Sequence, residues 1–182
     1  MVSINIVVCR ELKTPVGQVT LGAIGEQLCL CDWKNSKKRA RNDNRLKRLL
    51  KAEYMDFASA DDNMNGTLLL LRKAEQELYE YFSGKRKSFD IPLLMVGTDF
   101  QKQVWQVLLD IPYGSTVSYL DVARRIGNPK GVRAVAQAIG SNPISILVPC
   151  HRGVGSNGCL TGYAGGVDAK RFLLQLEHGS RL

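Results

Sequence analysis

The stretch ILVPCHR, residues 146–152, places a thiol, an imidazole and a guanidinium in consecutive positions. An apolar run that ends in Pro149 predicts a buried strand, which would hold Cys150 rigidly at the floor of a cleft. The thiolate is the nucleophilic form of cysteine, so a reactive Cys150 needs a group that takes its proton. His151 follows directly and is one of only two histidines in the chain. The chemistry that these residue types indicate is nucleophilic attack by sulfur.

Adjacency alone does not make Cys150 and His151 a catalytic pair. Neighbouring side chains in an extended segment point to opposite sides, so the pair needs a bridging water or a turn at Cys150. Glu177, far along the chain, is a candidate to orient the second imidazole nitrogen. For an isolated Cys-His dipeptide, a packed thiol beside a surface histidine is the commoner interpretation.

A glycine-rich segment follows the cysteine. Six glycines lie between residues 153 and 166, and a helix is expected to begin near Asp168. Such a tight-turning loop could form the wall of a small pocket over a fixed thiol. A hydrolase loop or a purely structural turn would have a similar composition.

Ahead of the cysteine, the pattern predicts a helix-turn-helix. Thr98 can cap a helix that ends before Ile111, and Ser118 opens a second, shorter one. The turn GNPKG at 127–131 then leads into a helix with the sequence VRAVAQAIG. Two short helices joined by a turn with Gly and Pro match this DNA-binding motif.

The last of these helices is unusual in its small residues. Ala134, Ala136 and Ala138 would leave a slender surface around Arg133, which would let the helix approach a nucleic acid closely. Spacing alone supports equally well that the alanines pack against the neighbouring helix and that Arg133 is an ordinary surface cation.

Composition limits the class of protein. The 182 residues carry 25 Lys and Arg against 17 Asp and Glu, a net charge of +8 that suits a polyanionic partner but does not require one. The sequence has no signal-peptide pattern and no run of about 18 apolar residues, so we expect a cytoplasmic protein without a membrane partner. Five cysteines and two histidines form no familiar zinc spacing, so no metal is expected, and reduced thiols are favoured over disulfides.

The first half of the chain is organised differently. Apolar patterns at 4–9, 17–23 and 27–33 predict a short antiparallel sheet. The segment 34–51 holds nine cations and one anion; a solvated loop leading into a helix is the commoner meaning of such a run, and contact with DNA backbone is the alternative. Residues 68–82 predict a helix of about four turns with a Gly stop.

Several motifs, taken together in their order along the chain, resemble those of one known family more specifically than any single motif does. The sequence resembles the methylated-DNA-protein-cysteine methyltransferases, also called O6-alkylguanine-DNA alkyltransferases. The resemblance is dense from about 68 to 178 and fainter over the first 60 residues. The motifs that carry it are GTDFQKQVW (97–105), IPYGSTVSY (111–119), GNPKGVRAV (127–135), NP (142–143), PCHR (149–152) and GYAGG (162–166).

The resemblance implies a fold and an activity. The fold is α+β: an N-terminal, ribonuclease-H-like domain over 1–93 with a small antiparallel sheet and a helix, then a mostly helical domain over 94–182 with the helix-turn-helix and the cysteine. The implied activity is direct-reversal DNA repair on double-stranded DNA. A guanine alkylated on O6 is flipped from the duplex, and the cysteine takes the alkyl group irreversibly, once per molecule. Activity on O4-alkylthymine stays open. The family needs no cofactor and acts as a monomer on the minor groove.

Roles follow residue by residue from the matching motifs. Cys150 would be the nucleophile and His151, through a water, its base. Glu177 would orient the imidazole, Asn142 would support this network, and Tyr119 would assist the leaving guanine. Arg133 would be a finger that fills the gap left by the extruded base. The other DNA-facing residues implied by the same motifs are Ser118, Tyr119, Ala134, Ala136 and Ala138. The pocket residues that they imply are Gly153, Tyr163 and Ala164.

Two positions depart from the family pattern. Family members usually carry Val or Ile where this chain has Gly153, so a side chain that closes the pocket is lost. Ala164 stands where Ser is common, a change of little consequence if a backbone N–H makes the contact. Three other classes of protein fit the sequence less well. A lesion-binding relative without chemistry would lack Cys150, a redox-sensing helix-turn-helix regulator would show no lesion preference, and a cysteine hydrolase would give the helix-turn-helix no role.

Overall fold

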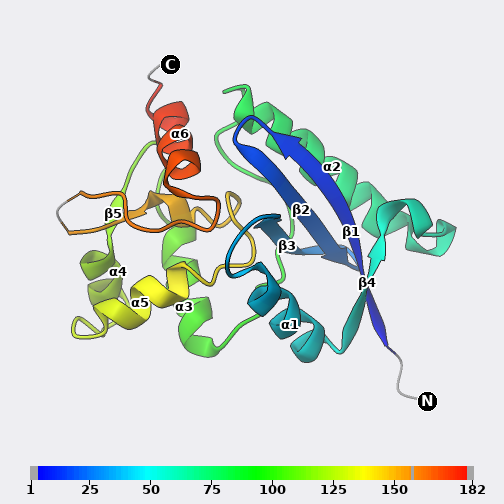
Figure 1. The fold of residues 1–182 in the computed structure, drawn as a ribbon, viewed down its shortest axis with the longest axis horizontal. Helices are drawn as coiled ribbons and strands as arrows, with labels where there is room; N and C mark the ends of the chain where they lie inside the picture. Colours follow the sequence, from blue (N-terminus) through cyan, green and yellow to red (C-terminus); the bar gives the residue numbers. More distant parts are fainter. Residues whose placement is uncertain (1–3, 157, 180–182) are drawn as a thin grey trace.

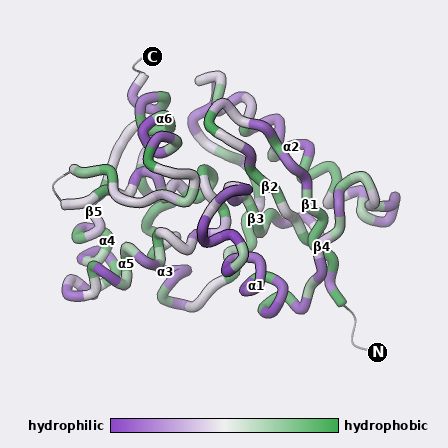
Figure 2. Tube along the Cα trace, in the orientation of Figure 1, coloured by the Kyte–Doolittle hydropathy of each residue, from purple (hydrophilic) through white to green (hydrophobic). Residues whose placement is uncertain are grey.

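The computed structural model describes residues 4–156 and 158–179; the outermost ends of the two predicted domains and Asn157 in the glycine-rich loop lie outside the described residues. The predicted α+β fold class is confirmed (Figure 1). An N-terminal sheet flanked by helices is followed by a mostly helical C-terminal part. Figure 2 shows apolar strands at the centre of the first part and a hydrophilic run along the chain before α1.

The N-terminal sheet has four strands in the order β3-β2-β1-β4. The three predicted strands pair antiparallel, and a fourth, which the sequence did not predict, joins β1 in parallel. This strand is five residues long and half polar, so it gives no clear alternation, as is common at sheet edges. The strands are β1 Asn5–Thr14, β2 Gly17–Ile24, β3 Gln27–Trp33 and β4 Ala52–Asp56.

Two helices cover opposite faces of this sheet. Val8 packs with Leu71 and Leu78 of one helix, whereas Val7 packs with Leu46 of the other, because successive strand residues point to opposite faces. The basic segment 34–51 therefore forms a short loop that leads into a helix, as its pattern predicted. The two helices are α1 Arg39–Leu50 and α2 Asn65–Phe82, and short 3-10 turns lie between β4 and α2 at Phe57–Ser59 and Asp62–Met64.

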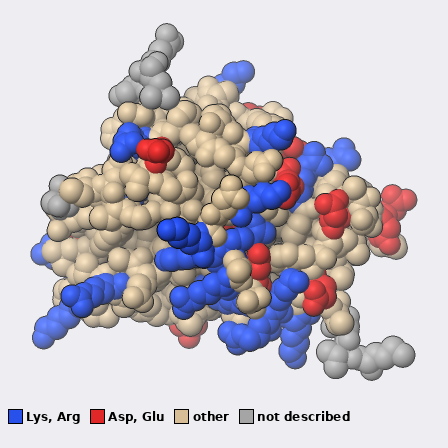
Figure 3. Space-filling model, in the orientation of Figure 1, with Lys and Arg blue, Asp and Glu red and all other residues tan. Residues whose placement is uncertain are grey.

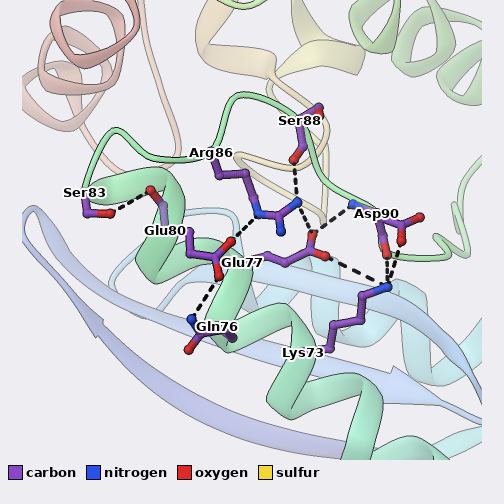
Figure 4. Close-up of polar contacts among 8 residues, drawn as sticks. All are labelled: Lys73, Gln76, Glu77, Glu80, Ser83, Arg86, Ser88 and Asp90. Atoms are coloured by element: carbon purple, nitrogen blue, oxygen red, sulfur yellow. Dashed lines mark hydrogen bonds and ion pairs between the residues drawn. The ribbon is translucent and has the colours of Figure 1, made fainter.

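A polar network fixes the connector that leaves α2 (Figure 4). Glu77 is buried, accepts a hydrogen bond from the Asp90 backbone N–H at 2.8 Å, and lies 3.6 Å from the guanidinium of Arg86. Arg86 also bonds Glu80 at 2.8 Å, and Lys73 bonds Asp90 at 3.0 Å. These contacts hold residues 83–90 against the helix, which keeps its last turn, and Tyr81 in it, in a fixed position.

The C-terminal part builds the predicted helix-turn-helix. Thr98 caps the first helix through a capping box with Gln101, and Ser118 caps the next. The helices are α3 Asp99–Leu109, α4 Tyr119–Arg125, α5 Val132–Ile139 and α6 Val167–His178; the two short parallel strands are β5 Val117–Ser118 and β6 Gly153–Val154.

The edge strand β3 joins the two parts. Its Leu28 accepts from Leu94 N–H and donates to Pro92 O, both at 2.8 Å. Further along, Cys31 exchanges backbone hydrogen bonds with residues 143 and 145 at 2.8 and 2.6 Å. The edge of the sheet is thereby covered, and the segment that leads to the candidate nucleophile is anchored on the N-terminal sheet.

Candidate active site

Cys150 lies at the start of a 3-10 turn, Cys150–Arg152, and is 4% exposed. The prediction of a buried strand before it was wrong: residues 141–149 form a compact irregular loop in which Ile146 has a φ of +74°. The predicted burial is correct, because Ile144, Ile146, Leu147 and Val148 are all in the core. The turn at the cysteine is one of the two arrangements that the adjacency to His151 required.

Asn142 explains the shape of this loop. Its side-chain NH₂ donates to Val148 O at 2.9 Å and Ile144 O at 3.4 Å, and its Oδ1 accepts from Ile144 N at 2.9 Å. An amide that bonds the backbone locally replaces the partners a strand would supply. Asn142 thus determines where the chain turns before Cys150, in line with the supporting position expected for it.

The thiol of Cys150 is buried among polar groups. Burial raises the pKa of Cys150, while the polar side chains of Asn142 and Ser145 and the charge of Lys170 lower it in part. The Ser145 hydroxyl lies 4.0 Å from the sulfur. The resting form is therefore the thiol, and attack requires that a base remove its proton.

His151 and Glu177 form a buried pair. The His151 Nε2 lies 2.7 Å from Glu177 Oε1, and both side chains are fully enclosed. Burial lowers the pKa of His151, and Glu177 opposes this only in part, so the imidazole is neutral near neutral pH. Since the carboxylate accepts, Nε2 carries the proton and Nδ1 is the acceptor. Among the described residues Nδ1 is buried without a hydrogen-bond partner, and it is available to a bridging water.

Glu177 is the hub of a larger network. It accepts from the Tyr81 hydroxyl at 2.7 Å, from Arg152 Nε at 2.9 Å and Nη2 at 3.0 Å, and from the Gly114 backbone N–H at 3.1 Å. Burial alone would raise the pKa of Glu177, but the hydrogen bonds from His151, Arg152 and Tyr81 hold it well below its ordinary value. The carboxylate that orients His151 is thereby kept ionised.

Sequence reasoning missed Lys170. Its side chain is 1% exposed, and its ammonium donates to Gly153 O at 2.6 Å and Thr161 O at 3.1 Å. Burial lowers its pKa, and its charge in turn lowers that of Cys150. A lysine among apolar residues on a predicted helix reads as a surface cation. Its position four residues after Gly166 was the only available signal, because it places Lys170 one turn inside α6.

A groove separates the C-terminal part from the N-terminal sheet. This interdomain groove has a volume of about 760 Å³ and is lined by the loop 161–167, by α5, by Trp33 at the end of β3 and by residues 35–38 after it. Tyr119, Tyr163 and Ala164 line it, as does Trp33 of the N-terminal part. The rings of Trp33 and Tyr163 meet edge to face with centroids 5.9 Å apart. Sequence reasoning gave Trp33 no role.

Comparisons with known proteins agree with this architecture and site. Residues 7–95 match the family model described as "6-O-methylguanine DNA methyltransferase, ribonuclease-like domain", and residues 99–179 match the model of the same methyltransferase's DNA binding domain. The chain belongs to the 6-O-methylguanine DNA methyltransferase family.

Full-length relatives support this membership. The chain is 40% identical to a methylated-DNA–protein-cysteine methyltransferase of Methanosarcina barkeri over 93% of its own length and 96% of the relative. It is 57% identical to the Methanosarcina acetivorans protein of that name over 58% of its length and 68% of the relative. A crystal structure of Mycobacterium tuberculosis OGT in complex with DNA matches with a TM-score of 0.78 and 38% identity, covering 94% of this chain and 93% of that one.

In this methyltransferase the predicted DNA-facing residues separate into two groups. Arg133 and Ala134 on α5 are exposed and Ala136 is half-buried. Ala138 is 3% exposed, and its backbone carbonyl accepts from the indole of Trp105 at 2.8 Å. The prediction that Ala138 faces DNA was therefore wrong: it lies on the inner side of α5, where packing against α3 requires a small side chain.

Two further predicted residues have local structural tasks. The Ser118 hydroxyl accepts from the Asp121 backbone N–H at 3.0 Å, donates to the Asp121 carboxylate at 2.6 Å and so caps α4. The Tyr119 hydroxyl lies 2.9 Å from the hydroxyl of Thr161 in the glycine-rich loop. Tyr119 therefore links the start of the helix-turn-helix to the wall of the groove.

Gly153 does not leave the hole that its missing side chain suggested. A Cβ at this position would lie 3.1 Å from the Tyr119 ring and 3.4 Å from both Ile139 and the Cys150 carbonyl. The Tyr119 ring and Ile139 thus already lie against the position that a side chain at residue 153 would take. The carbonyl of Gly153, one of the expected pocket residues, already accepts from Lys170 and retains a second lone pair.

Proposed function

We propose that Cys150 is the residue that accepts the alkyl group when this methyltransferase repairs DNA by direct reversal. The thiolate sulfur attacks the alkyl carbon in line with its bond to guanine O6. A carbon–sulfur bond forms, the carbon–oxygen bond breaks, and its electron pair remains on the guanine. The observation that carries the proposal is a buried thiol next to a neutral imidazole whose other nitrogen is fixed by an ionised carboxylate.

The proton of the thiol has a defined route in this proposal. His151 Nδ1 takes it through a bridging water, and Glu177 stabilises the imidazolium that results. The same carboxylate prevents the ring from presenting Nε2, so the orientation of the base is fixed before substrate binds. The leaving guanine needs a proton in return, and in this proposal the Tyr119 hydroxyl supplies it; the position of Tyr119 in the lining of the groove supports this role.

DNA is held by the helix-turn-helix. The O6 atom of a stacked guanine is out of reach of a buried thiol, so the alkylated base is flipped from the duplex into the space between Tyr119, Tyr163 and Ala164. Arg133 fills the gap that the base leaves. Ala134 and Ala136 let α5 enter the minor groove closely, where bulky side chains would prevent contact. The protein acts as a monomer.

Intact-protein mass spectrometry with a duplex that carries one O6-methylguanine tests this function. We expect the mass of one methyl group to be added, in proportion to the lesion and stopping at one per protein, with the gain on the Cys150 peptide. Cys150→Ser should gain nothing, while Cys159→Ser, which changes an exposed cysteine, should react as the parent does. Lesion binding by the parent without any mass gain would overturn the proposal in favour of recognition alone.

A further inference from the structure

The cations of the segment 34–51 are only partly neutralised within the protein. Three of the nine form ion pairs with carboxylates, namely Lys34 with Glu11, Arg39 with Asp43 and Lys47 with Glu53. Among the described residues no carboxylate lies within ion-pair distance of the other six, which are Lys37, Lys38, Arg41, Arg45, Arg48 and Lys51. A concentrated positive charge without internal compensation is typical of a surface that binds a polyanion.

Four of these six cations lie along one line that runs from the N-cap of α1 along the helix. Lys38, Arg41, Arg45 and Arg48 are separated by three, four and three residues, the spacing of one helix face, and we call them the α1 stripe. Burial lowers the pKa of Arg45, and the charge of neighbouring Arg41 lowers it further. The stripe thus keeps like charges close together. Their mutual repulsion costs free energy, and an anionic partner would reduce that cost.

Contacts with the C-terminal part show which way the stripe faces. Arg45 Nη2 donates to Ser141 O at 2.8 Å, and its guanidinium lies 5.5 Å from the centroid of the Trp105 ring. At the start of the stripe, the Lys38 ammonium lies so close to Gly140 that a Cβ there would come within 2.5 Å of it. Gly140 ends α5, so the stripe begins beside the helix that is proposed to enter the DNA groove.

The surface is continuous between the two parts. Lys37 and Lys38 line the interdomain groove together with Ala136 and Gln137 of α5. In Figure 3 the blue atoms gather over α1 and the chain before it, and further blue atoms lie over the region of α4 and α5 on the same face. The distance along α1 is about 18 Å for twelve residues, long enough to follow a stretch of duplex.

We propose that the α1 stripe and Lys37 bind the phosphodiester backbone of the same DNA that the helix-turn-helix holds, so that both parts of the protein contact the duplex. The proposal rests on the proposed function. DNA carries one charge per about 1.7 Å of helix axis, so a duplex lying along α1 offers phosphates to Arg41 and Arg48 at whatever sequence is present. Arg45 anchors the helix, and the exposed members of the stripe make the contacts.

The salt dependence of DNA binding tests this surface. Arg41→Gln/Arg48→Gln removes two exposed charges, keeps good helix formers on α1 and breaks no hydrogen bond or ion pair of these side chains with the other described residues. Each phosphate contact adds about 0.9 to the slope of log affinity against log salt. We expect the slope to fall by about 2 on lesion-bearing and on undamaged duplex alike.

A matched variant separates local contact from net charge. Lys13→Gln/Lys85→Gln also removes two exposed cations, on β1 and on the connector after α2, and should leave the slope close to that of the parent. Equal slopes in the α1 variant and the parent would overturn the proposal, as would equal losses in both double variants.

Alkyl transfer from free O6-benzylguanine, measured by mass spectrometry, makes the two proposals distinguishable. The base lacks phosphates, so Arg41→Gln/Arg48→Gln should react with it as fast as the parent does. If the parent gains mass from neither the free base nor lesion DNA, the proposed function fails. If the parent reacts but the α1 variant has the same salt slope of DNA binding as the parent, only the α1 proposal fails. Loss of reaction with the free base in the variant would also contradict it, because the effect would then not be DNA contact.

Discussion

Lys170 connects the segment that follows Cys150 to the glycine-rich loop: its ammonium donates at 2.6 Å to the carbonyl of Gly153, three residues after Cys150, and at 3.1 Å to that of Thr161 in the loop. The buried charge therefore has two tasks. It ties the glycine-rich loop to the segment that follows Cys150, and it favours the thiolate of Cys150.

Lys170→Met should slow alkyl transfer and move its pH dependence. The charge lowers the pKa of Cys150, so its removal raises that pKa, and the rising limb of the rate against pH should shift to higher pH. Two carbonyls also lose their hydrogen-bond donor, and each one that stays buried without a partner lowers the stability of the protein by about 1–3 kcal/mol. Rates with free O6-benzylguanine across a pH series check this. Lys170→Arg retains the charge and should keep the pH limb nearer to that of the parent; a slower rate with an unshifted limb in Lys170→Met would show a purely structural role.

Glu177→Gln should strongly destabilise the protein. The substitution leaves the Arg152 guanidinium, which is 7% exposed, without its counter-charge, and breaking one side of a buried pair costs about 3–5 kcal/mol. Urea unfolding measures the loss. Glu53→Gln, which breaks the exposed pair with Lys47, should cost no more than about 1 kcal/mol. Similar losses in the two variants would mean that the Glu177 network contributes little to stability.

The free energy of unfolding should fall with acid in two stages. The pKa of His151 is lowered in the folded state, so below about 6.5, its ordinary value, the unfolded chain binds the proton more readily and stability declines. The pKa of Glu177 is also lowered, so its contribution is complete above 4.5 and is lost as pH falls further. Urea titrations over this range check both stages. In His151→Gln the first stage should diminish; an unchanged decline would assign it to other groups.

Gly165→Ala should disrupt the wall of the groove. A Cβ at Gly165 would lie 2.5 Å from the Trp33 ring, so the loop or the indole must move, at about 1–3 kcal/mol for overpacking. Transfer from the free base should slow. Gly162→Ala is the control, because its Cβ meets nothing within 4 Å. Trp33→Leu combined with Gly165→Ala should recover part of the rate. If the effects of the two substitutions on the rate simply add in the double variant, Trp33 does not act through this loop.

Gly153→Val should narrow the range of alkyl groups that react. The Cβ of the new side chain would lie 3.1 Å from the Tyr119 ring, so the ring must move. Overpacking of this kind costs about 1–3 kcal/mol. We expect the rate with O6-benzylguanine to fall more than the rate with O6-methylguanine. Parallel mass-spectrometric time courses with the two bases give the ratio, and equal effects on both would indicate that Gly153 does not control size.

Local patterns predicted much of this protein because their physical causes are local. The capping of α3 by Thr98 and of α4 by Ser118, the alternation in β1 to β3 and the Gly after α2 need only nearby residues to be recognised. The same holds for the burial of the apolar run before Cys150. The run's conformation was mispredicted, because the Asn142 side chain and the β3 edge, and not periodicity, satisfy its backbone.

The sequence by itself determined that a cysteine followed by histidine and arginine lies after a helix-turn-helix. It also determined that the basic run 34–51 precedes the helix α2. Only the tertiary structure decided what these residues meet. His151 and Glu177 are 26 residues apart, Tyr81 and Glu177 are 96, and Lys170 reaches back 17 to Gly153. Burial of Ala138 and exposure of Arg133, on one short helix, likewise depend on the side that packs against α3. Periodicity fixes which residues share a face, but the partner of that face depends on how distant segments pack together.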